Sequence, residues 1–216
     1  MILRTPKVGF TGGAGDPPST PTDQLLVRCP RWEAACRSPL VADVAARLRP
    51  WEALLAWVSQ HNELALGLSA LAELALRSAP ADHLDYVDAL AVRLREDARF
   101  AAEWARRAGG EPANATPATV ALLHLIAQIG EAHSYSVQAV ALWQWFEIQY
   151  LAWAAEVMLR RPASDLRRRF ASQFSWDVVR PFRQALNRRL AANPDECLGL
   201  QHVFDQLTGQ LAARSW

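Results

Sequence analysis

The sequence predicts an all-α protein, a single-domain bundle of about seven to eight helices within residues 23–216. No segment shows the alternation of apolar and polar residues that is typical of strands. Apolar residues instead recur at helical spacing between Pro, Gly and capping residues. One stretch, residues 134–161, contains neither Pro nor Gly and carries apolar side chains on every side of a helical wheel. That pattern indicates a buried central helix around which the others pack.

The N-terminal segment, residues 1–22, is rich in Pro and Gly and poor in large apolar side chains, so we expect a flexible arm. Asp23 is a suitable N-cap for a first helix that continues to about Arg37. Ser38 is expected to begin a second helix, because the Pro that follows it suits a first helical turn. The later helices are expected at residues 50–80, 84–108, 116–130, 134–161, a segment that begins at 164, and 194–214.

Pro and Gly residues define most of these boundaries, because Pro cannot continue a helix from within and Gly commonly ends one. Pro181 falls inside the seventh expected helix, where we expect a kink or a break. The boundary residues are Pro50, Pro80, Gly109, Pro117, Pro162 and Pro194.

Composition restricts the classes of function. The net charge is +1, which does not favour nucleic acid as a partner. Gln144 and Glu147 interrupt the most apolar stretch, so no membrane span is expected. The three Cys form no CxxC pair, and residues 1–10 lack the apolar core of a secretory signal. We therefore expect a cytoplasmic protein with ordinary thiols.

Three stretches carry a family resemblance: residues 38–62, residues 94–110 and residues 134–150. The first contains S-P-L-V and, further on, W-V-S-Q-H-N; the third begins S-Y-S-V-Q-A-V-A-L. They resemble the haem-oxygenase-like fold, the group that includes the thiaminase-II-like (TenA-like) proteins, the pyrroloquinoline quinone synthases and iron-dependent oxidases. The resemblance implies the same helical bundle and a role in small-molecule metabolism.

The departures from these families bear on chemistry. A thiaminase-like enzyme needs a nucleophilic Cys in the central helix, but Gln144, Trp145 and Phe146 occupy the matching place. His61 replaces the acidic residue that usually follows the Gln of the first motif. Asp177 survives in the segment that resembles the last ligand helix of the iron oxidases, but both His positions there are non-ligands. A six-ligand diiron site is therefore not favoured, and the first helix has no His to bind haem.

A polar group on the central helix is the main chemical candidate. A carboxylate buried at Glu147 would have a raised pKa and could act as a general acid or base. The alternative is a structural ion pair between Glu147 and an Arg of a neighbouring helix. The predicted catalytic residues are Glu147, Tyr150 and His61, and the predicted pocket adds Trp143, His124 and His133. A mononuclear site built from Glu147, His124, Glu131 and His133 is a further alternative, so iron stays open as a cofactor.

Two functions follow from these observations. The first is an enzyme or enzyme-like protein that acts on an apolar or aromatic small molecule, by cofactor-free oxidation, acid–base chemistry or an iron-dependent reaction. The second is a non-catalytic accessory subunit that binds a partner enzyme or a peptide substrate, with an oligomer as an open question. The short matches Cys29-Pro30-Arg31, Ala56-Trp57 and Leu64-Ala65 resemble helical partner subunits of peptide-modifying iron enzymes. An Arg-rich stretch, residues 160–189, could supply the docking surface.

Overall fold

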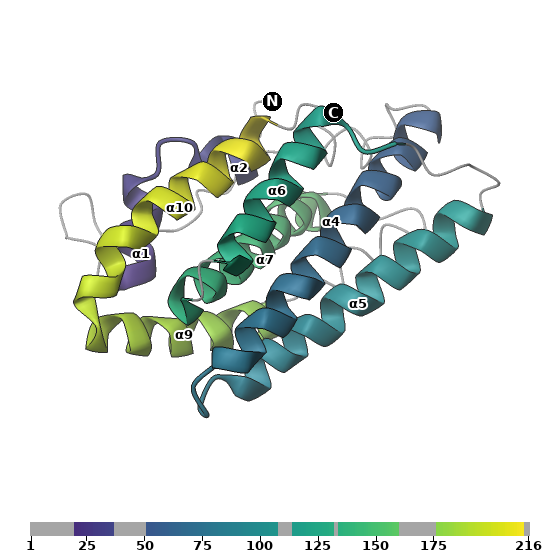
Figure 1. Cartoon of the computed structure of the whole chain (residues 1–216). Helices are drawn as coiled ribbons and strands as arrows, with labels where there is room; N and C mark the ends of the chain where they lie inside the picture. Colours follow the sequence, from purple (N-terminus) through teal and green to yellow (C-terminus); the bar gives the residue numbers. More distant parts are fainter. Residues whose placement is uncertain (1–19, 37–50, 108–113, 132–133, 160–175, 214–216) are drawn as a thin grey trace.

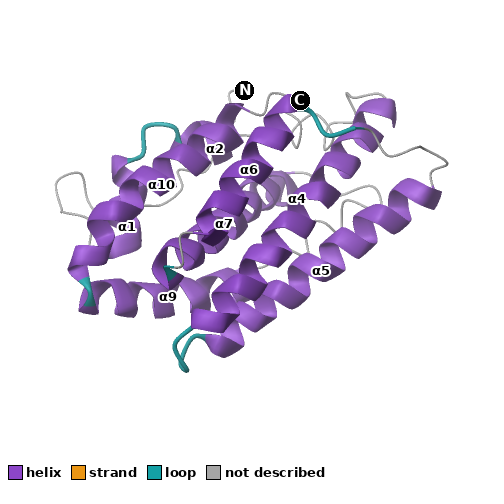
Figure 2. Cartoon of the chain, viewed as in Figure 1, coloured by secondary structure: helices purple, strands orange, loops and turns teal. Residues whose placement is uncertain are grey.

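The computed structural model describes residues 20–36, 51–107, 114–131, 134–159 and 176–213, and these residues form helices and no strand (Figures 1 and 2). The all-α prediction is thus confirmed for the described chain. Eight helices are defined there: α1 (Pro21–Arg28), α2 (Trp32–Cys36), α4 (Trp51–Ser78), α5 (Leu84–Arg107), α6 (Pro117–Glu131), α7 (Tyr135–Leu159), α9 (Trp176–Ala192) and α10 (Pro194–Ala213).

Helix α7 is the central helix that the sequence predicted. Every residue from 138 to 148 is buried, and α7 contacts α2, α4, α6, α9 and α10. In Figure 1 it runs through the middle of the bundle, behind α6. Its largest core side chains are Trp143, Trp145 and Phe146, each no more than 2% exposed. Burial of these aromatic rings contributes much of the apolar area that stabilises the bundle.

Helices α4 and α5 lie side by side along their lengths, and α6 packs on the other side of α4 (Figure 1). Two glycines permit the close approach of α4 and α6. A Cβ at Gly67 would lie 2.7 Å from Leu123 Cδ2, and one at Gly130 would lie 2.8 Å from Leu74 Cδ1. The start of α6 is also attached to α4, because Gln60 Nε2 donates to the carbonyl of Asn114 and Gln60 Oε1 accepts from the N–H of Thr116, both at 2.8 Å.

The N-terminal helix differs from the prediction. The N-cap is Thr20 rather than Asp23, and the side chain of Thr20 accepts a hydrogen bond from the N–H of Asp23. Pro21 occupies the first turn, where its missing N–H costs nothing. The predicted helix to Arg37 is divided at Cys29, which is extended and precedes Pro30, so α1 and α2 are separate. Residues 1–19 of the predicted arm lie outside the described residues.

Most other boundaries agree with the sequence, because Pro at a helix start and the polar caps act locally. Thr116 Oγ1 accepts from the N–H of Thr119 at the start of α6. The predicted helix from Ser38 and the start predicted at Ser164 lie outside the described residues. Helix α9 continues through Pro181 without a break, although the Pro cannot donate a hydrogen bond to the carbonyl of residue 177.

No helix in the described part of the chain is long and apolar enough to span a membrane.

Candidate functional site

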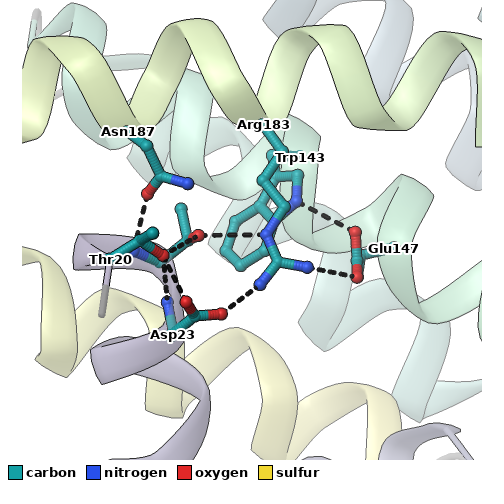
Figure 3. Close-up of polar contacts among 7 residues, drawn as sticks. Thr20, Asp23, Trp143, Glu147, Arg183 and Asn187 are labelled. Carbon is teal, nitrogen blue, oxygen red and sulfur yellow. Dashed lines mark hydrogen bonds and ion pairs between the residues drawn. The ribbon is translucent and has the colours of Figure 1, made fainter. Parts of the chain in front are cut away.

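Glu147 and Arg183 form the centre of a partly buried polar network between α7, α9 and α1 (Figure 3). Arg183 donates from Nη1 to Glu147 Oε1 at 3.0 Å and from Nη2 to Asp23 Oδ1 at 2.6 Å. The second oxygen of Glu147 accepts from the indole N–H of Trp143 at 3.1 Å. The guanidinium carbon of Arg183 also lies 5.5 Å from the centroid of the Trp143 ring. Both oxygens of Glu147 therefore accept a hydrogen bond. The sequence had left open a structural ion pair between Glu147 and an Arg of a neighbouring helix, and Arg183 is that Arg.

The same network fixes the start of α1. Arg183 Nε donates to Thr22 Oγ1 at 3.0 Å, and the N–H of Thr22 donates to Asn187 Oδ1 at 2.9 Å. Thr22 is fully buried, so these bonds replace the hydrogen bonds to water that its polar atoms lose on folding. The first helix is held against α9 by side chains of both helices.

Burial raises the pKa of Glu147, as the sequence analysis expected. Loss of water around the carboxylate is the main cause, and Asp23 adds to it. The positive charge of Arg183 and the hydrogen bond from Trp143 act in the opposite direction. The catalytic role of Glu147 stays a prediction, because the bonds from Arg183 and Trp143 are equally those of a structural ion pair.

A second buried polar group lies between α4 and α5. His61 Nε2 is 2.5 Å from Asp97 Oδ2, and the two side chains are only 2% and 4% exposed. An ionised Asp97 accepts a hydrogen bond from the Nε2–H of His61. The basic lone pair of the neutral imidazole is then on Nδ1. The His61 ring stacks on Trp57 with centroids 5.0 Å apart and lies 5.9 Å from the ring of Trp145 on α7. Two indole rings thus flank a carboxylate-bonded imidazole.

Two polar atoms of this cluster have no hydrogen-bond partner among the described residues, namely Asp97 Oδ1 and Trp145 Nε1. A buried polar group without a partner costs about 1–3 kcal/mol, so such atoms are uncommon and are found preferentially at functional sites. Asp97 Oδ1 is a hydrogen-bond acceptor, and Trp145 Nε1 is a donor. We refer to His61, Asp97, Trp57 and Trp145 as the His61 cluster.

The structure disperses the other predicted site residues. Tyr150 is half-buried on α7, three positions beyond Glu147, whereas Trp143 is fully buried and bonds Glu147. His124 lies between Leu122 and Ile126 in sequence but is exposed on the outward side of α6, and its place in a pocket stays a prediction. The predicted pocket residue His133 lies outside the described residues.

The predicted iron site has no support in the described part of the chain, where no group of three or more His, Cys, Asp or Glu side chains could hold a metal ion. Glu131 is exposed, whereas Glu147 is buried in its pair with Arg183. Asp177, the residue that survives from the iron-oxidase pattern, is exposed at the start of α9. These residues do not fit an iron centre, and we derive no step through iron.

Comparison with solved structures identifies the fold. The chain superposes on the crystal structure of a TenA homologue from Pyrococcus furiosus with a TM-score of 0.80, covering 89% of this chain and 96% of that chain at 14% sequence identity. This chain has the TenA-like fold. The resemblance to the haem-oxygenase-like group is thereby confirmed at the level of fold. No family model matches the sequence, and no curated protein matches it either.

The sequence matches Gln144, Trp145 and Phe146 to the place of the nucleophilic Cys of the thiaminase-like enzymes, and the first of these, Gln144, is a structural residue in this chain. Its side chain is fully buried and donates from Nε2 to the carbonyl of Phe204 at 2.9 Å and to Thr208 Oγ1 at 2.5 Å. The three Cys of the chain lie elsewhere, and burial raises the pKa of each thiol, that of Cys36 to about 12. Neutral thiols are weak nucleophiles, so these three environments do not favour a nucleophilic Cys.

Several of the residues that suggested an accessory subunit are core residues, whereas Pro30 and Arg31 of the same matches are exposed. Cys29, Trp57, Leu64 and Ala65 are all buried. Arg183, which belongs to the Arg-rich stretch, binds internal carboxylates. These positions therefore supply no docking surface, and the accessory-subunit alternative stays a prediction.

Sequence reasoning missed the carboxylate partners. Asp97 follows the helical spacing of Leu90, Leu94 and Ala101 on the buried side of α5, and a charged residue in an apolar stripe is a signal that could have identified it. Nothing local to Glu147 indicated Arg183 and Asp23, because these residues lie 36 and 124 positions from it along the chain.

Proposed function

We propose that this chain is an enzyme of small-molecule metabolism that binds a planar aromatic compound at the His61 cluster and uses the His61–Asp97 pair for acid–base chemistry. The observation that carries the proposal is the pair of buried polar atoms without a partner, Asp97 Oδ1 and Trp145 Nε1. A ligand that donates to the first and accepts from the second would remove both penalties when it binds.

The chemistry of the cluster supports this choice of ligand. Trp57 stacks on the His61 ring and Trp145 lies beside it, so the surroundings of the imidazole are aromatic, and a planar aromatic ligand would add stacking worth about 0.5–1.5 kcal/mol beyond burial of area. Asp97 orients the imidazole through Nε2 and stabilises it when it gains a proton. His61 is then the proton acceptor, and Asp97 positions it.

The first test uses two small probes of similar size, 2-aminopyridine and toluene. The amino group of 2-aminopyridine can donate to Asp97 Oδ1, and its ring nitrogen can accept from Trp145 Nε1. Toluene offers the ring without the polar atoms. We expect 2-aminopyridine to quench tryptophan fluorescence and raise the melting temperature at lower concentration than toluene does. Native mass spectrometry of the purified protein would then show whether a natural aromatic ligand is bound.

Variants locate the binding. D97N and W145F should each weaken binding of 2-aminopyridine by about tenfold, the effect of one hydrogen bond to a charged or buried group. E147Q is the matched control, because Glu147 is an equally buried carboxylate outside the His61 cluster. Equal affinity for the two probes, or a larger effect of E147Q than of D97N, would contradict the proposal. The second of these results would restore Glu147 as the principal candidate.

A further inference from the structure

The guanidinium of Arg183 has two sides that bind different parts of the chain (Figure 3). On one side, Nη1 donates to Glu147 on the central helix. On the other side, Nε and Nη2 form the edge that can bind two oxygens at once, and both donate to α1, Nε to Thr22 Oγ1 and Nη2 to Asp23 Oδ1. The edge best suited to an oxyanion is therefore occupied by a hydroxyl and a carboxylate of the first helix.

The two sides also differ in their exposure to water. The side chain of Glu147 is 4% exposed, whereas those of Arg183 and Asp23 are 18% and 22% exposed. The ion pair with Asp23 is therefore in contact with solvent, and the core encloses Glu147. Arg183 would keep its position without α1, because Glu147 binds Nη1 and the guanidinium carbon lies 5.5 Å from the centroid of the Trp143 ring.

Helix α1 is a small element that can leave this edge without loss of the bundle. It has eight residues, of which three are buried, namely Thr22, Leu25 and Leu26. A helix attached through so few side chains should open locally at a much lower free energy than the whole bundle unfolds. Asp23 also has a partner in its own first turn, because Oδ2 accepts from Thr20 Oγ1 at 2.5 Å. Asp23 therefore keeps a hydrogen bond when Arg183 binds another anion.

We propose that the Nε/Nη2 edge of Arg183 is a binding site for the carboxylate of a small molecule, and that Asp23 and Thr22 occupy it in this structure as an internal substitute for that ligand. The ligand carboxylate takes both donors with its two oxygens, and α1 moves away from α9. Asp23 competes at a high effective concentration because it belongs to the same chain, so the ligand binds only molecules in which α1 is open. The site shares no residue with the His61 cluster and does not depend on the function proposed for that cluster.

The first test measures amide hydrogen exchange of the full chain with butanoate or butanamide added at constant ionic strength. The two probes have nearly the same shape, but only butanoate carries a carboxylate, and neither has an aromatic ring that would suit the His61 cluster. We expect saturating butanoate to speed exchange in residues 20–28 severalfold and to leave exchange in α5 unchanged. Butanamide should have no effect at the same concentration. An equal effect of the two probes, or no effect of butanoate, would overturn the proposal.

Variants change the internal competitor and the binding edge separately, with affinity for butanoate measured by calorimetry. D23A removes the competing carboxylate but leaves Arg183 on Glu147, so affinity should rise by about tenfold if α1 is open in about a tenth of the unaltered molecules. D195A is the matched control, because Asp195 is also an acidic residue in the first turn of a helix, α10, and its affinity should be unchanged. D23A/R183K keeps the positive charge but loses the two-donor edge, so the gain should disappear.

Circular dichroism checks that each variant keeps its helices, and D23A alone decides the question if the double variant does not fold. The proposal fails if D23A binds butanoate no more tightly than the unaltered chain. It also fails if D195A gains as much affinity as D23A, or if a folded D23A/R183K binds as tightly as D23A.

Discussion

Trp143 and Trp145 lie two positions apart on α7 and are equally buried, but only Trp143 has its indole N–H hydrogen-bonded within the described chain. The two residues therefore provide a matched comparison of a satisfied and an unsatisfied polar group in one core.

Replacement of each Trp by Phe should separate the two roles. Both changes remove the same atoms and create similar cavities, so the two variants should lose a similar amount of stability from packing. W143F also leaves Glu147 Oε2 without its donor, whereas W145F removes an N–H that has no partner. We expect W143F to destabilise the protein by about 1–3 kcal/mol more than W145F, as measured by urea unfolding. Equal losses would mean that Trp145 Nε1 is bonded in solution.

Removal of Arg183 tests the network that joins α1, α7 and α9. R183M would leave Glu147 buried without its positive partner, and we expect a loss of about 3 kcal/mol in the free energy of unfolding. The double variant R183M/E147Q should recover part of this loss, because the amide carries no charge. A loss below about 1 kcal/mol for R183M would mean that solvent screens the pair as it does at a surface.

Stability should fall in mild acid because of His83. This ring is 1% exposed, lies 2.7 Å from Tyr135 Oη through Nδ1, and has a lowered pKa because burial, and then Arg189 and Arg188, disfavour its charge. Asp82 acts in the opposite direction. The folded state holds the neutral ring, so this contribution to stability is complete above the unfolded pKa of about 6.5 and is lost as the pH falls below it.

Melting temperatures between pH 8 and pH 5 measure this effect. H83Q should lower stability at pH 8, where the bond to Tyr135 is lost, but should reduce the further fall toward pH 5. H202Q is the control, because His202 is exposed on α10. A fall toward pH 5 that is as steep in H83Q as in the unaltered chain would assign the titration to other groups.

Two glycines in helices should respond differently to Ala. A Cβ at Gly199 in α10 meets nothing within 4 Å, so G199A should stabilise the protein by about 0.5–1 kcal/mol through helix propensity. G67A introduces a Cβ 2.7 Å from Leu123 Cδ2, and the movement of that side chain offsets the gain. Thermal unfolding should therefore rank G199A above G67A, and the reverse order would mean that α4 and α6 separate readily.

The parts that the sequence predicted well depend on short-range physics. Proline at the start of α6 and α10 acts within one helical turn, and the even apolar distribution around α7 agrees with the burial of residues 138–148 on every side of the helix. The incorrect N-cap at α1 also concerns a single helical turn, since Thr20 and Asp23 are both good N-cap residues and lie three positions apart. Local pattern favours a helix there but does not select between the two caps.

The polar clusters could be predicted only in part. His61 and Glu147 were identifiable as polar residues within apolar helices, but their partners lie on other helices, and pairing at that distance depends on how helices cross. His124 shows a related limit of local pattern: its sequence neighbours are apolar, but the rotation of α6 places it at the surface.

The bond between Arg183 and Asp23 joins positions 160 residues apart, so α1 gains its main polar anchor only when α9 is present. A ribosome synthesises α1 first and α9 much later. During that interval the acidic side chain of Asp23 and the hydroxyl of Thr22 have water as their partner. Docking of α1 is therefore expected among the last steps of folding, after the α4–α5 hairpin has formed from contacts near in sequence. A nascent chain that stops before α9 should leave its first helix accessible to proteases.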